Sequence, residues 1–298
     1  ANDINSFVRL YGNNSSGTVP VSEKDTIYDG RKIINTSKSY SYDNNTHRER
    51  TRMEEDKSDG SLHITKYLRP ADFNAAGSNA FVTKMISQHN ITPIIEQQEF
   101  VQRGGTTTLL SGTFTNYKSY GTGFYKPDVI YKTEIANPIN GLSATTFQSN
   151  GQVTLDANYK PQIYFDTYNN LGGVQSLHKA NDVSETYLWG YQSQFPVAKI
   201  VGADYNTVKQ FITQSILDNP SSDQQLRDHL ANLRLHFPTA NISYYTYNPL
   251  TGMTSEIDAS GKTSYYEYDS FGRLLLIKDQ NGKILKQFDY QYQKPVTQ

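Results

Sequence analysis

Aromatic and polar residues alternate in the C-terminal third of the chain in two copies of one pattern. The segment Tyr244-Tyr245-Thr246-Tyr247-Asn248 matches Tyr265-Tyr266-Glu267-Tyr268-Asp269 at a constant offset of 21 residues, from 244 to 265 and from 248 to 269. A Tyr-x-Tyr alternation places both rings on one face of a β-strand. We therefore predict a strand at each copy and a second short strand over Leu274-Leu275-Leu276-Ile277.

An Asx residue with a Gly three or four positions later punctuates these strands. Asp258 and Gly261 recur 21 residues further on as Asp279 and Gly282. These residues favour tight turns, because Asx side chains bond the nearby backbone and Gly accepts a positive φ. Each unit is thus predicted to be a β-hairpin, which can bury its face only by stacking on neighbouring units.

Further copies extend the pattern beyond this pair. The turn between the two strands is one residue longer in the first copy, at 248–252, than in the second, at 269–272. A partial copy follows at Phe288-Asp289-Tyr290-Gln291-Tyr292, and an earlier one precedes at Tyr168-Asn169-Asn170-Leu171-Gly172. Tyr168 and Trp189 are again 21 residues apart, so the repeat is predicted to begin well before residue 240.

Two stretches break the alternation and are predicted to be helical. Residues 203–237 carry apolar residues at helical spacing, with Asp204 as an N-cap, Asn219-Pro220 as an end, and Ser222 with Gln225 at capping-box spacing. We interpret this stretch as a helical hairpin inserted between two repeats. A shorter helix is expected near residues 78–89, where one face would carry Phe81, Val82, Met85, Ile86 and His89.

The predicted organisation has four parts. Residues 1–160 form a β-rich N-terminal region with one short helix, including a long polar hairpin over 37–68 that has a charged middle. Residues 161–202 and 241–298 hold the repeats, and residues 203–240 hold the helical insertion. The expected fold class is mainly β, a curved antiparallel ribbon of hairpins with helical insertions.

Composition supports β structure and excludes several function classes. The 298 residues include 23 Tyr, which favour pleated, half-buried surfaces, and no Cys, which excludes disulfides, thiolate nucleophiles and zinc ribbons. The formal net charge of -1 argues against a nucleic-acid partner, because such proteins carry a strongly basic face. Apolar runs fall far short of the ~20 residues of a membrane helix, so no transmembrane segment is predicted, and no signal peptide is visible at the first residues.

The repeat resembles a known family. The segment from Tyr266 to Leu274, with Asp279 and Gly282 behind it, is similar to the tyrosine–aspartate (YD) repeat of the rearrangement-hotspot (RHS) family. The blocks Tyr187-Leu188-Trp189-Gly190-Tyr191 and Phe195-Pro196-Val197-Ala198-Lys199 resemble RHS-like proteins of the Bacteroidota. The resemblance implies a large exported or surface protein, whose repeats form a long sheet that can coil into a shell around a C-terminal effector.

The sequence departs from the family pattern in three ways, and these departures limit which part of such a large protein the chain resembles. No toxin domain follows the last repeat, and the self-cleaving Asp-Pro-x-Gly motif is replaced by Asp258-Ala259-Ser260-Gly261. The chain also holds too few strands to close a cage. It therefore resembles the C-terminal part of a larger RHS-like chain, or a truncated relative of that family. The resemblance implies a secreted or outer-membrane-exterior location in a Gram-negative bacterium.

No motif for catalysis or for a cofactor is recognisable. His229 and His236 lie seven residues apart on a predicted helix without a third metal ligand, and neither Gly-x-Ser-x-Gly nor a calcium loop occurs. The acidic run Glu54-Glu55-Asp56 has basic neighbours, as a solvated hairpin face would. We therefore expect no enzyme, no cofactor and no metal site.

The hypothesis is a structural one. The chain is expected to be a non-enzymatic β-shell or scaffold segment, or cargo of an outer-membrane export machinery, with the rest of a longer RHS-like chain or that machinery as partner. The alternative is a surface module that binds a glycan or a polypeptide through its Tyr-rich face. The residues expected to build the repeat are Tyr168, Gly172, Tyr187, Trp189, Tyr245, Tyr247, Gly252, Asp258, Gly261, Tyr266, Tyr268, Asp269, Gly272, Arg273, Asp279 and Gly282.

Overall fold

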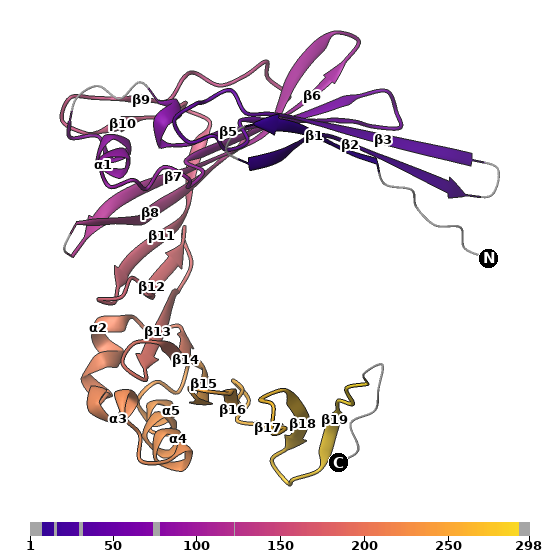
Figure 1. Cartoon of the computed structure of the whole chain (residues 1–298). Coiled ribbons are helices and arrows are strands. Elements are labelled where there is room, and N and C mark those ends of the chain that lie inside the picture. The colour runs from indigo at the N-terminus through magenta and orange to yellow at the C-terminus, as the bar shows by residue number, and fades with distance from the viewer. Residues whose placement is uncertain (1–7, 15–16, 30–31, 74–77, 122, 292–298) are drawn as a thin grey trace. The chain divides into compact units, whose positions relative to one another are not determined.

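The computed structural model describes residues 8–14, 17–29, 32–73, 78–121 and 123–291 (Figure 1). The expected partial copy at 288–292 therefore extends past the described residues at Tyr292. The chain divides into two compact units, residues 1–162 and residues 163–298. None of the helices in these ranges is long and apolar enough to cross a bilayer.

Unit 1 is an antiparallel meander in which each strand pairs with the next along the chain. A small separate hairpin, β9 (Thr146–Phe147) with β10 (Val153–Thr154), follows it. The meander strands are β1 (Val8–Asn14), β2 (Gly17–Asp29), β3 (Lys32–Ser41), β4 (Arg52–Asp56), β5 (Leu62–Leu68), β6 (Glu96–Arg103), β7 (Thr106–Tyr120) and β8 (Phe124–Thr133).

The main core of unit 1 lies where helix α1 (Phe81–Ser87) packs against β7. Phe81, Val82 and Met85 are buried on one face of this helix, as the predicted spacing requires. Phe81 meets Phe147 of β9 edge to face, with ring centroids 5.4 Å apart. The predicted helix near 78–89 is thus confirmed, and it ends before His89, which adopts a φ of 57°.

Unit 2 is a second antiparallel meander, and it contains the repeats. Its first strand, β11 (Tyr159–Tyr168), begins just before the boundary between the units. The others are β12 (Val174–Lys179), β13 (Ser184–Gly190), β14 (Phe195–Val201), β15 (Asn241–Asn248), β16 (Gly252–Ile257), β17 (Thr263–Tyr268), β18 (Leu274–Asp279) and β19 (Ile284–Gln287). The mainly β fold with helical insertions is confirmed.

The helical insertion occupies the turn between β14 and β15. These strands pair directly as far as Val201 opposite Asn241, so residues 202–240 loop out of one hairpin. The insertion contains four short α-helices and one 3-10 turn among its described residues rather than two long helices: α2 (Tyr205–Val208), η2 (Lys209–Phe211), α3 (Gln214–Asp218), α4 (Asp223–Ala231) and α5 (Leu233–His236).

The caps and the break of the insertion have local causes. Asp204 caps α2 by accepting the Thr207 N–H, and Ser222 caps α4 by accepting the Gln225 N–H at 3.1 Å. The reciprocal bond of the predicted capping box is displaced by one residue, because the Gln225 side chain accepts from the Ser221 N–H instead. The first predicted helix is interrupted at Thr213, whose N–H is directed to Nε2 of His229 at 3.0 Å.

The insertion buries a leucine-rich core against one face of β13–β16. Leu217, Leu226, Leu230 and Leu233 have at most 1 % of their surface exposed and belong to one cluster with strand residues such as Ile242. Burying a leucine side chain fully contributes roughly 1.5–3 kcal/mol. The insertion is therefore the main source of apolar burial in this meander.

A chain of hydroxyl groups also fastens α4 to the sheet. The Thr254 hydroxyl donates to Asp223 of α4 at 2.6 Å, so it accepts from the Thr246 hydroxyl at 2.8 Å. Thr246 in turn accepts from Ser255 at 2.6 Å, and Ser255 accepts from the Arg227 guanidinium at 3.1 Å. Thr246 and Ser255 are fully buried, and the chain satisfies both hydroxyls.

Candidate functional site: the repeat ladder

Four hairpin turns of unit 2 share one hydrogen-bond pattern. In each, the opening Asx N–H donates to the carbonyl four residues on, and Oδ1 of the same Asx accepts that residue's N–H, both at 2.8–3.0 Å. The Gly at the fourth position of each turn has a φ between 74° and 86°, which L side chains rarely adopt. These turns span residues 169–173, 258–262, 269–273 and 279–283, and they place the predicted residues Gly172, Asp258, Gly261, Asp269, Gly272, Arg273, Asp279 and Gly282.

The turn at 269–273 adds an ion pair. The Arg273 Nε donates to Oδ2 of Asp269 at 2.7 Å, and the guanidinium lies over the ring of Tyr290, 4.4 Å from its centroid. The hydrogen bond from Arg273 lowers the pKa of Asp269 below its usual value. The Gly-Arg step of the motif therefore holds this turn and supports the ring of Tyr290, which lies just beyond β19.

The longer turn at 248–252 keeps the same Asx function with one more residue. Oδ1 of Asn248 accepts the Leu250 N–H at 3.1 Å, and the turn ends at Gly252 with a φ of 146°. A Cβ on Gly252 would lie 2.7 Å from the hydroxyl oxygen of Tyr268. This glycine is required both by its backbone conformation and by the close approach of the ring.

A β-bulge lies opposite the last aromatic residue of each repeat strand, because the second strand of the hairpin carries one extra residue there. The pairing register shifts between Leu188 and Trp189 in β13, between Thr246 and Tyr247 in β15, and between Glu267 and Tyr268 in β17. It shifts again just before Tyr168 in β11. A bulge bends its strand and increases the local twist, so the repeat carries a regularly placed source of curvature that the sequence analysis did not predict.

Two of these aromatic residues, Trp189 and Tyr268, and Tyr290 beyond β19 tie consecutive hairpins together. Trp189 Nε1 donates to the Val174 carbonyl, and the Tyr268 hydroxyl donates to the Met253 carbonyl, each at 2.8 Å and across 15 residues of sequence. The Tyr290 hydroxyl does the same to Leu274 at 2.8 Å, across 16 residues. We call this bond the aromatic clasp, because each one links an aromatic side chain to the first residues of the second strand in the preceding hairpin.

The residue just before each clasped carbonyl makes room for the ring. Gly173 lies beneath Trp189 and Gly252 beneath Tyr268, so closely that a Cβ on either would meet the ring or its hydroxyl at under 3 Å. The third clasp has Arg273 in this position, and its guanidinium stacks on Tyr290. The clasps explain why aromatic residues and small or planar partners recur at the same period.

Two other predicted tyrosines of the repeat pair with carboxylates. The hydroxyls of Tyr187 and Tyr266 donate to Glu185 and Glu256, both at 3.0 Å. Burial, with the Glu256 carboxylate beside it, raises the pKa of Tyr266 to about 12, so the phenol stays protonated and donates. Burial also raises the pKa of Tyr245. These rings serve packing and hydrogen bonding.

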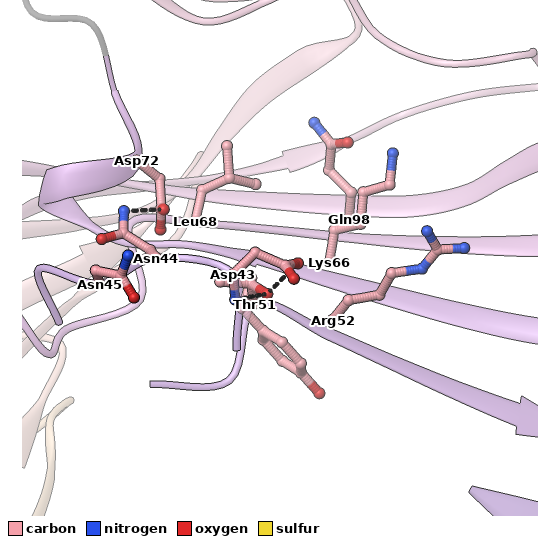
Figure 2. A pocket seen from close by; sticks show the side chains of 10 residues that line it. Asp43, Asn44, Asn45, Thr51, Arg52, Lys66, Leu68, Asp72 and Gln98 are labelled. Carbon is pink, nitrogen blue, oxygen red and sulfur yellow. Dashed lines mark hydrogen bonds between the residues drawn. The ribbon is translucent and has the colours of Figure 1, made fainter. Parts of the chain in front are cut away.

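Unit 1 contains an open pocket of about 650 Å³ beside the loop over residues 42–51 (Figure 2). In Figure 2, Asp43 contacts Thr51 and Asn44 contacts Asp72, so two of its polar side chains already bond within the wall. The sequence predicts one long hairpin over 37–68. In the structure this hairpin is interrupted, because residues 42–51 form the loop between β3 and β4 instead of continuing the strands.

A buried polar group behind that pocket holds the loop. His47 Nδ1 accepts the Glu49 N–H at 3.0 Å, which leaves Nε2 to donate to Asp72 at 2.9 Å. Asp72 also accepts the Arg69 N–H at 2.8 Å, and the buried Arg69 donates to the Arg50 carbonyl at 2.8 Å. This network therefore has a structural role, because its hydrogen bonds hold the loop over residues 42–51 in place.

The histidines singled out by the sequence do not converge. His229 accepts the Thr213 N–H, and burial lowers its pKa, whereas His236 stacks on Phe211 with centroids 4.1 Å apart. Within the described ranges, no group of three or more His, Asp or Glu side chains is arranged to hold a metal ion.

Comparison with known proteins yields only distant structural likenesses. No protein-family model and no curated protein matches the sequence. The chain is similar to a crystal structure of TcdB2-TccC3-Cdc42 (8 % identity, TM-score 0.36, 90 % of this chain and 12 % of that chain). It is also similar to TcdB2-TccC3 without its hypervariable C-terminal region (11 %, TM-score 0.35, 95 % and 16 %), and to the Photorhabdus luminescens Tc holotoxin pore (7 %, TM-score 0.33, 91 % and 12 %).

The chain thus spans only 12–16 % of the length of these structures. The RHS-type resemblance rests on the motif residues themselves, which the structure places in the repeated turns and clasps of unit 2.

Proposed function

We propose that this chain is a non-enzymatic segment of an exported or cell-surface protein, whose repeat ladder serves as a β-scaffold. One observation supports this proposal above the others. The Asx, Gly and Arg side chains or backbone of the motif, and its last aromatic residues, are engaged in bonds that set turns and join neighbouring hairpins. A motif used for geometry in this way suits a scaffold that extends by adding further hairpins.

The proposed partners are the rest of a longer RHS-like chain or an outer-membrane export machinery of a Gram-negative bacterium. The strands beyond the insertion, β17 to β19, contain no fully buried residue, and further hairpins or a partner strand would cover them. The proposal of a secreted or surface location comes from the resemblance of the motif.

Location and assembly can be tested together in the native bacterium. Intact cells are treated with an external protease, and an antibody against unit 2 follows the protein in cell-surface, culture-fluid and cytosolic fractions. We expect loss of the signal from intact cells or its presence in the fluid, within a species much larger than 33.7 kDa. A signal confined to the cytosol, resistant to protease in intact cells, would contradict the proposal.

A further inference from the structure

A second open pocket, of about 640 Å³, lies within unit 2. Three segments line it: residues 191–194 after β13, residues 218–223 between α3 and α4, and residues 247–249 at the end of β15, with Thr254. This volume is typical of sites for small or chain-like ligands. We call it the turn pocket.

The backbone on one side of the turn pocket is strained. Tyr191, Gln192 and Ser193 have φ values of 49°, 59° and 64°, whereas glycine takes the positive φ in the four Asx turns. Residues other than glycine rarely adopt this conformation. The Tyr191 N–H donates to the Leu217 carbonyl at 2.9 Å and the Gln192 N–H to Asp218 at 3.2 Å, so the helical insertion holds this turn. Strain that the surroundings maintain is characteristic of functional sites.

Two fixed aromatic rings stand in the wall. Tyr247 stacks on Phe195 with centroids 4.8 Å apart, and Tyr191 meets Tyr247 edge-on at 5.9 Å. The Tyr191 hydroxyl accepts the Tyr247 N–H at 2.9 Å, which fixes both rings. Within the described residues neither phenol hydrogen has an acceptor, so both hydroxyls can donate to a ligand.

The remaining wall offers hydrogen bonds without a positive charge. The side chains of Gln192, Gln194 and Asn219 are exposed and make no bond within the described residues, and no Lys, Arg or His lines the pocket. Asp218 and Asp223 each already accept hydrogen bonds from the protein through one oxygen. Amide groups both donate and accept, and so they match hydroxyl groups better than they match an ammonium ion, which can only donate.

From this combination we propose that the turn pocket binds a neutral oligosaccharide. The C–H face of a sugar ring packs on a tyrosine ring, and the hydroxyl groups exchange hydrogen bonds with amides, phenols and carboxylate oxygens. The open shape admits a chain that continues beyond the pocket. None of the four Asx turns contributes a residue to this pocket, so binding at the site can be tested apart from the scaffold role.

The test uses the full chain against a printed array of neutral oligosaccharides and a lysine homopeptide, with calorimetric titration of each positive probe. Gln194→Ala combined with Asn219→Ala removes two pocket side chains that make no bond within the described residues. Gln280→Ala, at an exposed turn outside the pocket lining, is the control. Removing two ligand hydrogen bonds should weaken binding by about tenfold or more, with the control unchanged.

A second variant probes the ring contact, and its fold is checked by thermal unfolding. Tyr191→Ala removes a ring of the wall, and we expect it to abolish saccharide binding while unit 2 still unfolds cooperatively. Should Tyr191→Ala fail to fold, the amide pair decides the question alone. Absence of binding to every arrayed saccharide, binding only to the lysine homopeptide, or equal affinity in the amide pair and the control would each overturn the proposal. The scaffold role is measured separately, through location and stability.

Discussion

The strands beneath the helical insertion and the strands beyond it follow the same repeat, yet only the first group has a core. Strands β13, β15 and β16 bury residues at alternate positions. Strands β17 and β18 have no fully buried residue, and all four residues of β19 are exposed. The turns, the bulge and the clasp occur in both groups. Local motif chemistry therefore sets the shape of each hairpin, whereas apolar burial comes from the insertion.

The largest expected effect separates the two groups through core truncation. Leu230→Ala removes a fully buried side chain between the insertion and the sheet, and it should destabilise unit 2 by about 2–5 kcal/mol. Leu276→Ala, in the uncovered strand β18, should cost about 1 kcal/mol or less. Urea unfolding followed by the fluorescence of Trp189, the single tryptophan, measures both. Equal losses would show that the insertion does not carry the core.

We expect Gly→Ala substitutions to lower the free energy of unfolding by a similar amount in each turn, except where an aromatic ring lies against the glycine. Gly272→Ala imposes a Cβ at a φ of 74° with one ordinary contact, at 3.8 Å to the Thr251 side chain, and should cost about 1–2 kcal/mol. Gly252→Ala should cost more, because its Cβ would also meet the Tyr268 hydroxyl. Ser270→Ala, in the same turn as Gly272, is the control and should change little. Urea midpoints that fall in the reverse order would contradict this account.

The clasps can be weakened one hydroxyl at a time. Tyr268→Phe removes the bond to the Met253 carbonyl and keeps the ring, for an expected loss of about 0.5–1.5 kcal/mol. Tyr290→Phe removes the equivalent bond at a side chain that is 40 % exposed, where water can replace it, and should cost less. The difference is measured by thermal unfolding of the two variants. Identical, negligible losses would mean that the clasp is a packing contact without a net hydrogen-bond contribution.

Features that depend on local chemistry could be predicted from the sequence. The alternation of Tyr residues predicts the strands, and Asp269 with Gly272 predicts a turn whose donors and acceptors all lie within five residues. The two helical stretches are predictable from apolar spacing and from capping residues such as Asp204. The repeat period itself indicates that consecutive hairpins neighbour each other.

Features that depend on distant backbone could not be predicted. The acceptor of the Trp189 clasp is a main-chain carbonyl, which leaves no residue type to recognise in the sequence. The break at Thr213 depends on His229 of another helix, and the opening of the 37–68 hairpin depends on His47 meeting Asp72. The left-handed turn at 191–193 lacks the glycine that usually signals a positive φ.

The smallest expected effect concerns the charge of the Asp269 carboxylate, in the turn between β17 and β18. The pKa of Asp269 is lowered in the folded state by its bond to Arg273. Its contribution to stability is therefore complete above the unfolded-state pKa of about 3.9 and is lost as the pH falls through the lower folded-state value. Asp269→Asn keeps an Asx acceptor, as Asn169 and Asn248 do in their own turns, but it cannot titrate.

At pH 6 the Asp269→Asn variant should unfold at a lower temperature than the parent protein, because it lacks the charged bond to Arg273. The difference in midpoint should shrink as the pH falls below about 4, where the parent carboxylate begins to take up a proton. Thermal unfolding at a series of pH values, with Asp289→Asn as a control at an exposed residue outside the four Asx turns, measures this change. A difference that stayed constant with pH would show that the Asx acceptor, which both side chains supply, is what this turn requires, and that the ion pair adds nothing to it.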